Sequence, residues 1–241
     1  MSRSVSPVTD RIAWHCAQYA EPKRSTIALR DFATRTLAGE DPPATVLDAG
    51  SGAGANMLHL ADLYPNARWT GVDLNEDLVE LGREHLDPSR FTMSVGNLLC
   101  LEQQLGAKRF DLCFSVMTLS WIADYERAVQ QMLAVTGRWL LILNLFADTD
   151  LDAFTRVRGR RAGPYQEFDE HYNVYSLPRF REFCLGLGAN EVIAEPFEID
   201  VDLPRPDHGG MGTWTERTED GRRLQFSGPL AMPWWFVAVR V

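Results

Sequence analysis

The sequence predicts an α/β fold in which a largely parallel sheet of seven strands carries helices on both faces. Short apolar runs alternate five times with segments of helical spacing between residues 44 and 146, the order typical of parallel sheets. Residues 139–146 (WLLILNLF) are almost wholly apolar, as in a central strand buried on both faces. Residues 46–57 (VLDAGSGAGANM) connect the first strand to the first helix through three glycines at alternate positions. Strand, glycine turn and helix in this order open a nucleotide-binding unit.

Two helices are expected before the sheet begins. Thr9 and Asp10 can cap a helix that Pro22 ends, and residues 25–37 carry apolar side chains at helical spacing. A minimal sheet needs neither helix, and one possibility is that both only cover apolar sheet surface.

The other elements follow in order through one domain, residues 44–241. The expected strands are 45–48, 68–73, 90–95, 109–116, 138–146, 191–202 and 234–239, and the expected helices are 53–64, 75–86, 100–105, 125–135 and 176–187. Residues 147–175 interrupt the alternation and are expected to form a cap insertion over the carboxyl end of the fifth strand. Asp220-Gly221, between the β-rich runs 213–218 and 222–226, predicts an antiparallel hairpin.

Composition narrows the class of protein. Asp plus Glu number 33 against 24 Lys plus Arg, and the resulting charge of −9 is unlike that of a nucleic-acid binder. The four cysteines form no C-x-x-C pair, which favours reduced thiols and no bound metal. The sequence shows neither a signal peptide nor an apolar run of membrane-spanning length, so we expect a cytoplasmic protein. Monomer and homodimer both remain open.

Spacing around the glycines indicates which ligand binds. Asp48 lies two positions before Gly50, and the second strand, WTGVD, ends at Asp73, where a carboxylate can accept both hydroxyls of a ribose. With G-x-G-x-G in place of G-x-G-x-x-G, residues 44–146 resemble the class I S-adenosylmethionine-dependent methyltransferases, which have a Rossmann-like sheet. The resemblance implies S-adenosylmethionine as cofactor. It implies these cofactor-binding residues: Tyr19, Asp48, Gly50, Gly52, Gly54, Asp73, Leu74, Asn97, Leu98 and Ser115.

Several of these positions have expected roles. Asn97 should lie beside adenine, where many members of the family have aspartate, and Leu74 and Leu98 should flank the ring. Ser115 and Met117, after the fourth strand, should face the methionine part. In the same segment, Leu119 and Trp121 are expected in the core. In the family, helices that precede the sheet fold over the cofactor, so the resemblance implies that residues 1–43 form an N-terminal helical cap over the site. Tyr19 and Lys23-Arg24 of this leading segment could reach the same place.

The sequence indicates catalytic residues less clearly than cofactor-binding ones. The segment SVMTLSW after the fourth strand contains no histidine or acid that could act as a base. The motif N/D-P-P-Y/F, which enzymes that methylate adenine or amide nitrogen use, is absent. Asn144, at the end of the fifth strand, could direct its amide at the substrate. His171 is the histidine most expected in a pocket, followed by His15. Tyr172, Tyr175 and other aromatic residues of the last third could surround a cationic centre.

Three functions remain open. The first is methyl transfer to a small molecule, placed in secondary metabolism. The second is a cyclase that closes S-adenosylmethionine to azetidine-2-carboxylate and methylthioadenosine, with Asn144, Tyr172 or Tyr175, and Ser227 orienting the amine. The third is a non-catalytic S-adenosylmethionine-binding module. The arginines between 156 and 161 indicate either an anionic substrate or a solvated helix face.

Overall fold

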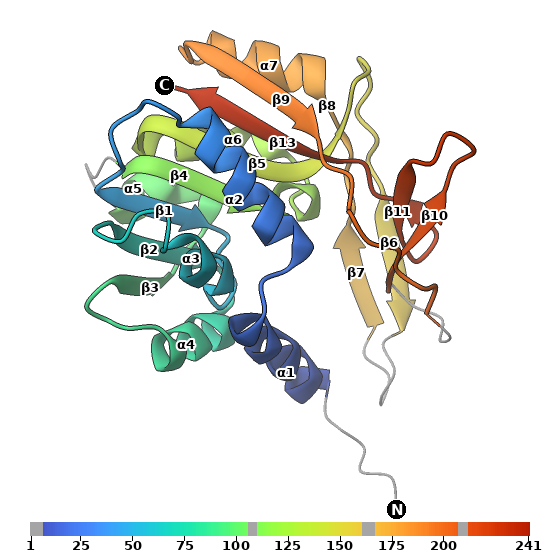
Figure 1. Cartoon of the computed structure of the whole chain (residues 1–241), viewed down its shortest axis with the longest axis horizontal. Coiled ribbons are helices and arrows are strands. Elements are labelled where there is room, and N and C mark those ends of the chain that lie inside the picture. Colours follow the sequence, from blue (N-terminus) through green and yellow to red (C-terminus); the bar gives the residue numbers. More distant parts are fainter. Residues whose placement is uncertain (1–6, 106–109, 161–166, 207–211) are drawn as a thin grey trace, which may run out of the picture.

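The computed structural model describes residues 7–105, 110–160, 167–206 and 212–241 (Figure 1). Its centre is a sheet with the strand order β3-β2-β1-β4-β5-β13-β9. The strands are β1 (Thr45–Ala49), β2 (Arg68–Asp73), β3 (Phe91–Val95), β4 (Phe110–Val116), β5 (Thr136–Ala147), β9 (Glu191–Pro196) and β13 (Trp234–Arg240). The first five are parallel, and β13 runs antiparallel between β5 and β9. The predicted α/β class with helices on both faces is confirmed.

Two strands differ from the expectation. A two-residue strand, β8 (Tyr175–Ser176), pairs with the end of β5 and makes an eighth strand of the sheet. The sixth expected strand, 191–202, was predicted too long, because β9 ends at Pro196. Proline supplies no N–H for a further rung of the ladder, and the chain leaves the sheet there.

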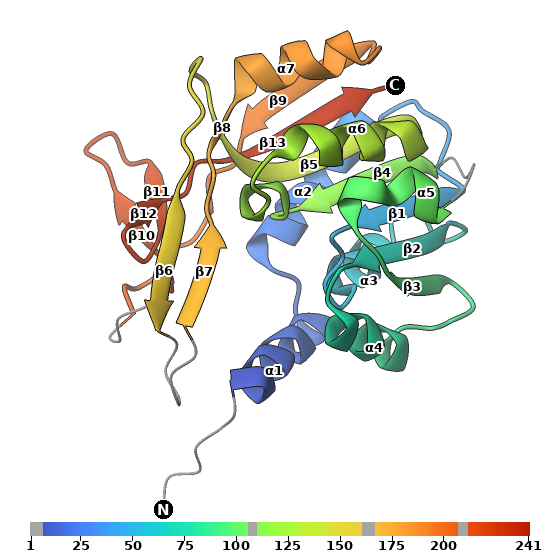
Figure 2. The same ribbon diagram turned by 180° about the vertical axis from the view of Figure 1, so that it is seen from behind.

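Helices cover both faces of the sheet, as Figures 1 and 2 show. On one face lie α2 (Arg24–Thr36), α3 (Ala55–Leu60) and α4 (Glu76–His85), and on the other lie the 3₁₀ turn η1 (Leu98–Cys100), α5 (Leu101–Leu105), α6 (Tyr125–Val135) and α7 (Leu177–Gly186). Neighbouring residues of a strand face opposite sides, so Phe114 joins one hydrophobic cluster and Cys113 the other. The near-continuous apolar runs in the sequence follow from this double burial.

The first two helices differ in what they cover, the surface of the sheet or the site at its edge. Leu29, Phe32 and Ala33 of α2 are buried against the sheet, and the ring of Phe32 stacks on Phe236 at 5.1 Å. In contrast, α1 (Pro7–Ala20) contacts α3 and α4, with Tyr19 packed against a small cluster that includes Ala53. Therefore α2 covers sheet surface, and only α1 lies as a cap over the first turn of the sheet.

Residues 147–175 contain a β-hairpin in place of the solvated helix face that was one expectation for the arginines. Strands β6 (Arg156–Arg160) and β7 (Glu167–His171) pair antiparallel, and Arg156 and Arg158 both form ion pairs with Asp169. The helical reading of this segment was wrong because alternate residues share a face of a strand, which brings both arginines to the same carboxylate. Arg161 lies outside the described residues.

The second predicted hairpin is confirmed. Strands β10 (Thr213–Arg217) and β11 (Arg223–Ser227) pair antiparallel, and β12 (Leu230–Ala231) adds a third strand. Gly221 in the turn has φ +84°, a conformation that glycine adopts without strain. The two small sheets lie beyond one end of the main sheet, on the same side as α1 (Figures 1 and 2).

Candidate cofactor and acceptor site

The glycine turn after β1 is held against the end of β2. Gly50 and Ser51 both donate backbone hydrogen bonds to the Val72 carbonyl oxygen, at 2.8 and 3.1 Å. Gly50 has φ +86°, and a Cβ there would lie 2.5 Å from the Thr118 hydroxyl oxygen. Only glycine combines this backbone conformation with such a close approach to the neighbouring loop. Gly52 and Gly54 also have positive φ, at +54° and +82°.

Asp73, at the tip of β2, joins the glycine turn to the next helix. Its carboxylate accepts hydrogen bonds from the backbone N–H of Gly52 at 2.7 Å and of Asn75 at 2.9 Å. Asn75 in turn caps α4 by accepting from the Leu78 N–H. Each carboxylate oxygen keeps a second lone pair, so Asp73 can still accept hydrogen bonds from a ligand.

Asp48 is a fully buried carboxyl group with no hydrogen-bond partner among the described residues. Burial raises its pKa well above the usual range, and the charge of Asp73 raises it further. A buried carboxyl group without a partner loses its hydration and gains nothing in return. A cationic ligand beside it would reverse both effects, so this group indicates where positive charge would bind.

The turns after β2 and β3 carry the side chains expected beside a flat ring. Leu74 is 70% exposed although it is a leucine, whereas Leu98 is buried. Asn97 lies between them in exposure and accepts a hydrogen bond from the Leu99 N–H at 2.9 Å. Because that bond uses the amide oxygen, the amide NH₂ group of Asn97 stays available as a donor.

The segment after β4 contacts the glycine turn but differs from expectation in detail. Ser115 is fully buried and its hydroxyl donates to the Ala49 carbonyl oxygen at 2.7 Å, so it connects β4 to β1. Met117 is half-buried with φ +55°, the sole positive φ outside glycine in the described part of the chain. Leu119 is in the core as expected. Trp121 was predicted wrongly, because 44% of it is exposed.

The cap helix α1 is joined to the glycine turn by Tyr19 near its C-terminal end. The Tyr19 hydroxyl donates to the Ala53 carbonyl oxygen at 2.5 Å, and its ring stacks on His85. Burial raises the pKa of Tyr19, which keeps this hydroxyl a donor. His15 lies over Gly52, since a Cβ built there would be 3.3 Å from the His15 ring. Sequence reasoning ranked His15 below His171, because a histidine's distance from a turn is not visible in the sequence.

Along the chain, Lys23 lies between two residues, Tyr19 and Thr26, that bond to residues at or just before the start of α3. Tyr19 bonds Ala53, and the Thr26 hydroxyl donates to Asn56 at 2.7 Å. Lys23 itself is half-buried, with its ammonium 4.1 Å from the centre of the Trp14 ring. It forms no ion pair with a described residue, and burial lowers its pKa to about 8.

Asn144 is engaged in holding the turn after β4, which corrects its expected orientation toward a substrate. It is fully buried, and its amide oxygen accepts from the Ser120 N–H at 2.8 Å. Asn173, which sequence reasoning missed, is also fully buried and donates to the Ile122 carbonyl oxygen at 3.0 Å. No sequence motif marks Asn173, because its partner is 51 positions away.

The structure separates Tyr172 from Tyr175. Tyr172 is buried in the hydrophobic cluster on the α2 face and contacts the Trp121 ring at 4.7 Å. Tyr175 is buried in the cluster on the opposite face, and its hydroxyl donates to the Ile122 carbonyl oxygen at 2.7 Å. The expected shared site for both tyrosines is therefore corrected, because residues three apart along this extended segment face opposite sides.

The other expected acceptor-side residues are dispersed. His171 is half-exposed at the end of β7, and Ser227 is buried at the end of β11. The Trp214 and Phe226 rings stack on each other at 4.5 Å, and Arg205 lies over Trp214, so they form no open cage. Tyr165 and His208 lie outside the described residues.

The described residues contain neither a metal-binding cluster nor a membrane-spanning helix. No group of three or more His, Cys, Asp or Glu side chains in the ranges given above could hold a metal ion. Within the same ranges, no helix has the length and apolar character to cross a membrane.

Comparison with known proteins identifies the family. A family model described as a methyltransferase domain matches residues 46–138. A trans-aconitate 2-methyltransferase of Variovorax paradoxus is 30% identical over 184 residues, which are 73% of this chain and 68% of that protein. The chain belongs to the class I S-adenosylmethionine-dependent methyltransferases. S-adenosylmethionine is accordingly the cofactor of this enzyme.

Two further similarities extend the comparison. A malonyl-[acyl-carrier protein] O-methyltransferase of Geobacter sulfurreducens is 36% identical over 140 residues. This match spans 57% of this chain but only 47% of that relative. The solved magnesium protoporphyrin IX methyltransferase of Synechocystis, with bound S-adenosylhomocysteine, superposes with a TM-score of 0.52 at 14% identity and covers all of this chain and 90% of its own. The second match shows a shared fold.

The described residues fit the family's cofactor. S-adenosylmethionine carries a sulfonium and an ammonium group, and the Asp48 carboxyl group, two residues before Gly50 in β1, is buried without a partner among the described residues. Positive φ at Gly50, Gly52 and Gly54 folds the turn tightly against the end of β2, and Asp73 retains acceptor capacity at the tip of that strand.

Proposed function

We propose that this methyltransferase transfers the sulfonium methyl group of S-adenosylmethionine to the carboxylate of a small-molecule acid. The observation that carries the acceptor class is Lys23, a half-buried ammonium group without an ion-pair partner among the described residues, next to the start of α3. A buried cation is destabilised until an anion joins it, so the position favours an anionic acceptor. Trans-aconitate and malonyl groups, which the two named relatives methylate, both carry free carboxylates.

We assign the cofactor to the first half of the sheet edge. Asp73 would bind the ribose hydroxyls while it keeps its bonds to Gly52 and Asn75. Asp48 would face a cationic group of the cofactor, and the exposed Leu74 with Leu98 and Asn97 would bound the adenine. Gly50 and Gly54 would let the backbone approach. Ser115 and Tyr19 would hold this cofactor site, the cofactor seat, in place by their hydrogen bonds to the carbonyl oxygens of Ala49 and Ala53.

Transfer to a carboxylate explains why a general base is dispensable. S-adenosylmethionine supplies an activated methyl group, and its displacement requires mainly alignment of the acceptor atom. A carboxylic acid with an unperturbed pKa of about 4 is already ionised at neutral pH. The segment Met117–Trp121 contributes no acid or histidine, in accord with such an acceptor.

The remaining candidates receive positioning roles. Asn144 and Tyr175 would hold the turn after β4 from behind, so that Met117 and Trp121 keep their places. Tyr172, packed on Trp121, would form an apolar wall beside the acceptor. His171 stays a candidate contact at the end of β7.

The test is product analysis with a panel of acids. The protein is incubated with S-adenosylmethionine and, separately, trans-aconitate, malonate, the matching amides and no acceptor. The proposal predicts S-adenosylhomocysteine and an alkali-labile methyl ester with an acid alone. Methylthioadenosine formed without any acceptor would instead identify a cyclase. Cofactor binding without either product would leave a binding module, and transfer to the amides at equal rate would contradict the carboxylate.

A further inference from the structure

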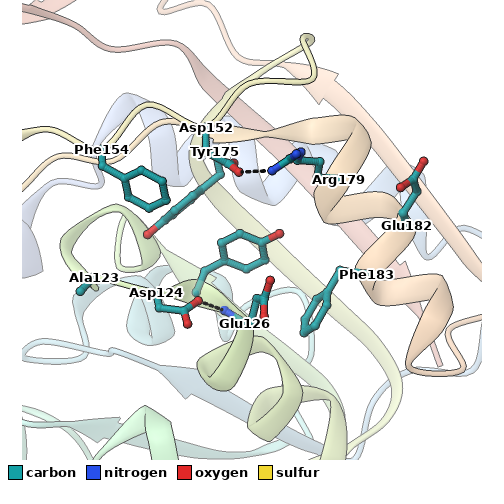
Figure 3. Close-up of a pocket in the computed structure, with 10 residues that line it drawn as sticks. Ala123, Asp124, Glu126, Asp152, Phe154, Tyr175, Arg179, Glu182 and Phe183 are labelled. Carbon is teal, nitrogen blue, oxygen red and sulfur yellow. Dashed lines mark hydrogen bonds and ion pairs between the residues drawn. The ribbon is translucent and has the colours of Figure 1, made fainter.

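One pocket among the described residues lies away from the glycine turn. It has a volume of about 670 Å³ and is formed by the start of α6, the start of α7 and the segment that follows β5. Figure 3 shows Phe154 and Tyr175 on one side of this pocket and Phe183 on the other. The rear pocket, as we name it, is lined by Ala123, Asp124, Tyr125, Glu126, Asp152, Phe154, Tyr175, Arg179, Glu182 and Phe183.

The rear pocket is distinct from the cofactor seat. Its tyrosines, Tyr125 and Tyr175, belong to the hydrophobic cluster on the α6 and α7 face. The Tyr175 hydroxyl reaches the Ile122 carbonyl oxygen at 2.7 Å, so the turn after β4 lies between the pocket and the acceptor side. The glycine turn and Asp73 belong to the first two strands and contribute nothing to its lining.

The charge of the lining is negative. Four acidic side chains and one arginine line the pocket. Arg179 forms an ion pair with Asp152 at 3.2 Å (Figure 3) and another with Asp150 at 2.8 Å, so its charge is already balanced. Asp124 caps α6 by accepting from the Glu126 N–H, which offsets the positive end of that helix. No ion pair joins the Glu126 or Glu182 side chain to the rest of the described chain.

Aromatic surface supplies the second feature. Phe154 is 69% exposed, so its ring surface is open to a ligand in the pocket. Its ring lies 6.3 Å from the Tyr175 ring, and Tyr175 packs on Tyr125 at 4.6 Å. Faces of aromatic rings attract organic cations, because their quadrupole is negative there.

Tyr125 adds an independent indication of a ligand. The residue is 94% buried, lines the pocket, and has no hydrogen bond from its hydroxyl to any described residue. Burial raises its pKa, and the neighbouring Asp152 and Glu126 raise it further, so the hydroxyl stays protonated. Because Tyr125 lines the pocket, a ligand with a polar atom can pair with this hydroxyl.

We propose that the rear pocket binds a small organic ammonium ion that also carries a hydroxyl or other polar group. The ammonium group lies against the aromatic rings, with Glu126 and Glu182 at the rim as counter-charges. The polar group pairs with the Tyr125 hydroxyl. This assignment is independent of the acceptor proposed above, because the two positions share no lining residue.

Calorimetry with choline and its uncharged analogue 3,3-dimethylbutan-1-ol tests the charge requirement. We expect choline to bind about 5- to 30-fold more tightly, the range that a desolvated cation–aromatic contact provides. Equal affinities, or no heat with choline up to millimolar concentration, would overturn the proposal. Saturating S-adenosylhomocysteine should change choline affinity less than twofold, whereas competition between the two would show that choline occupies the cofactor seat.

Three variants locate the site. Glu126→Gln should weaken choline binding about threefold or more, and added salt should abolish this difference because the rim is exposed. Tyr125→Phe retains the ring and should weaken choline binding while leaving tetramethylammonium unaffected, since that ion has no polar group to satisfy the hydroxyl. Glu84→Gln, an exposed acid on α4, is the matched control and should bind choline as the unmodified protein does. Unchanged choline affinity in both pocket variants would refute the assignment.

Discussion

The two halves of the sheet's carboxyl edge are built in different ways. At β1 and β2, one carboxylate, Asp73, bonds the glycine turn and the following helix over 21 and 2 positions of sequence. At β4 and β5, Asn144 and Asn173 hold the turn after β4 from 24 and 51 positions away. The first half is a local unit whose geometry follows from its own residues. The second depends on segments that meet only in the folded chain.

We expect the largest effect from a substitution of Gly50 in the first half of the edge. Gly50→Ala would place a Cβ 2.5 Å from Thr118 and should lower the affinity for S-adenosylhomocysteine at least tenfold. It should also lower the free energy of unfolding by about 1–3 kcal/mol beyond the backbone strain, the usual cost of overpacking. Gly39→Ala is the control, because Gly39 has φ +85° and no atom within 4 Å of its Cβ position. Calorimetry and urea unfolding would contradict the account if both variants behaved alike.

Asn144 tests the second half. Asn144→Ala removes the acceptor of the Ser120 N–H and should cost about 1–3 kcal/mol of stability, the penalty for an unpaired buried group. Turnover should fall roughly tenfold, because the turn beside the acceptor loses its support. Affinity for S-adenosylhomocysteine should change less than twofold, and the exposed Asn190→Ala serves as control. A parallel loss of cofactor affinity and turnover would assign Asn144 to the cofactor seat.

Lys23 sharpens the distinction between cofactor and acceptor. Lys23→Gln should raise KM for the acid roughly 3- to 10-fold, the loss of one charge-assisted contact at a half-buried site, with little change in kcat. The low pKa of about 8 adds a pH signature. The ammonium is charged below that pH, so kcat/KM for the acid should fall as pH rises through about 8. Lys23→Arg keeps its charge and should lose the decline, and a decline that persists in this variant would exclude Lys23 as its source.

The smallest expected effect is a pH dependence of cofactor binding. Burial raises the pKa of Asp48, so lowering the pH protonates the free protein at that group before an ordinary aspartate. A cation pairs with the ionised form alone, and S-adenosylmethionine affinity should therefore fall a few-fold on acidification. Asp48→Asn should bind weakly at every pH without this slope, as titration calorimetry in matched buffers would report. A slope of equal size in the variant would argue against Asp48.

This difference between the two halves explains which parts of the structure could be predicted from the sequence. The run 46–57 predicted the glycine turn and its helix, because both depend on neighbours along the chain. The parallel sheet with helices on both faces required only the alternation of strands and helices. The hairpin at 156–171 was not predicted, since its arginines resemble a helix face until Asp169 lies opposite them. Likewise, Tyr172 and Tyr175 look equivalent in the sequence, and only their pairing with Trp121 and Ile122 separates them.

The most direct test of the division between a cofactor half and an acceptor half is one pair of titrations. S-adenosylhomocysteine is titrated by calorimetry into Asp73→Ala and into Lys23→Gln under identical conditions. We predict a loss of about 1–3 kcal/mol of binding free energy for Asp73→Ala, the cost of removing polar partners at a partly buried site, and a change below twofold in Kd for Lys23→Gln. Unaltered affinity in Asp73→Ala, or equal losses in the two variants, would contradict it.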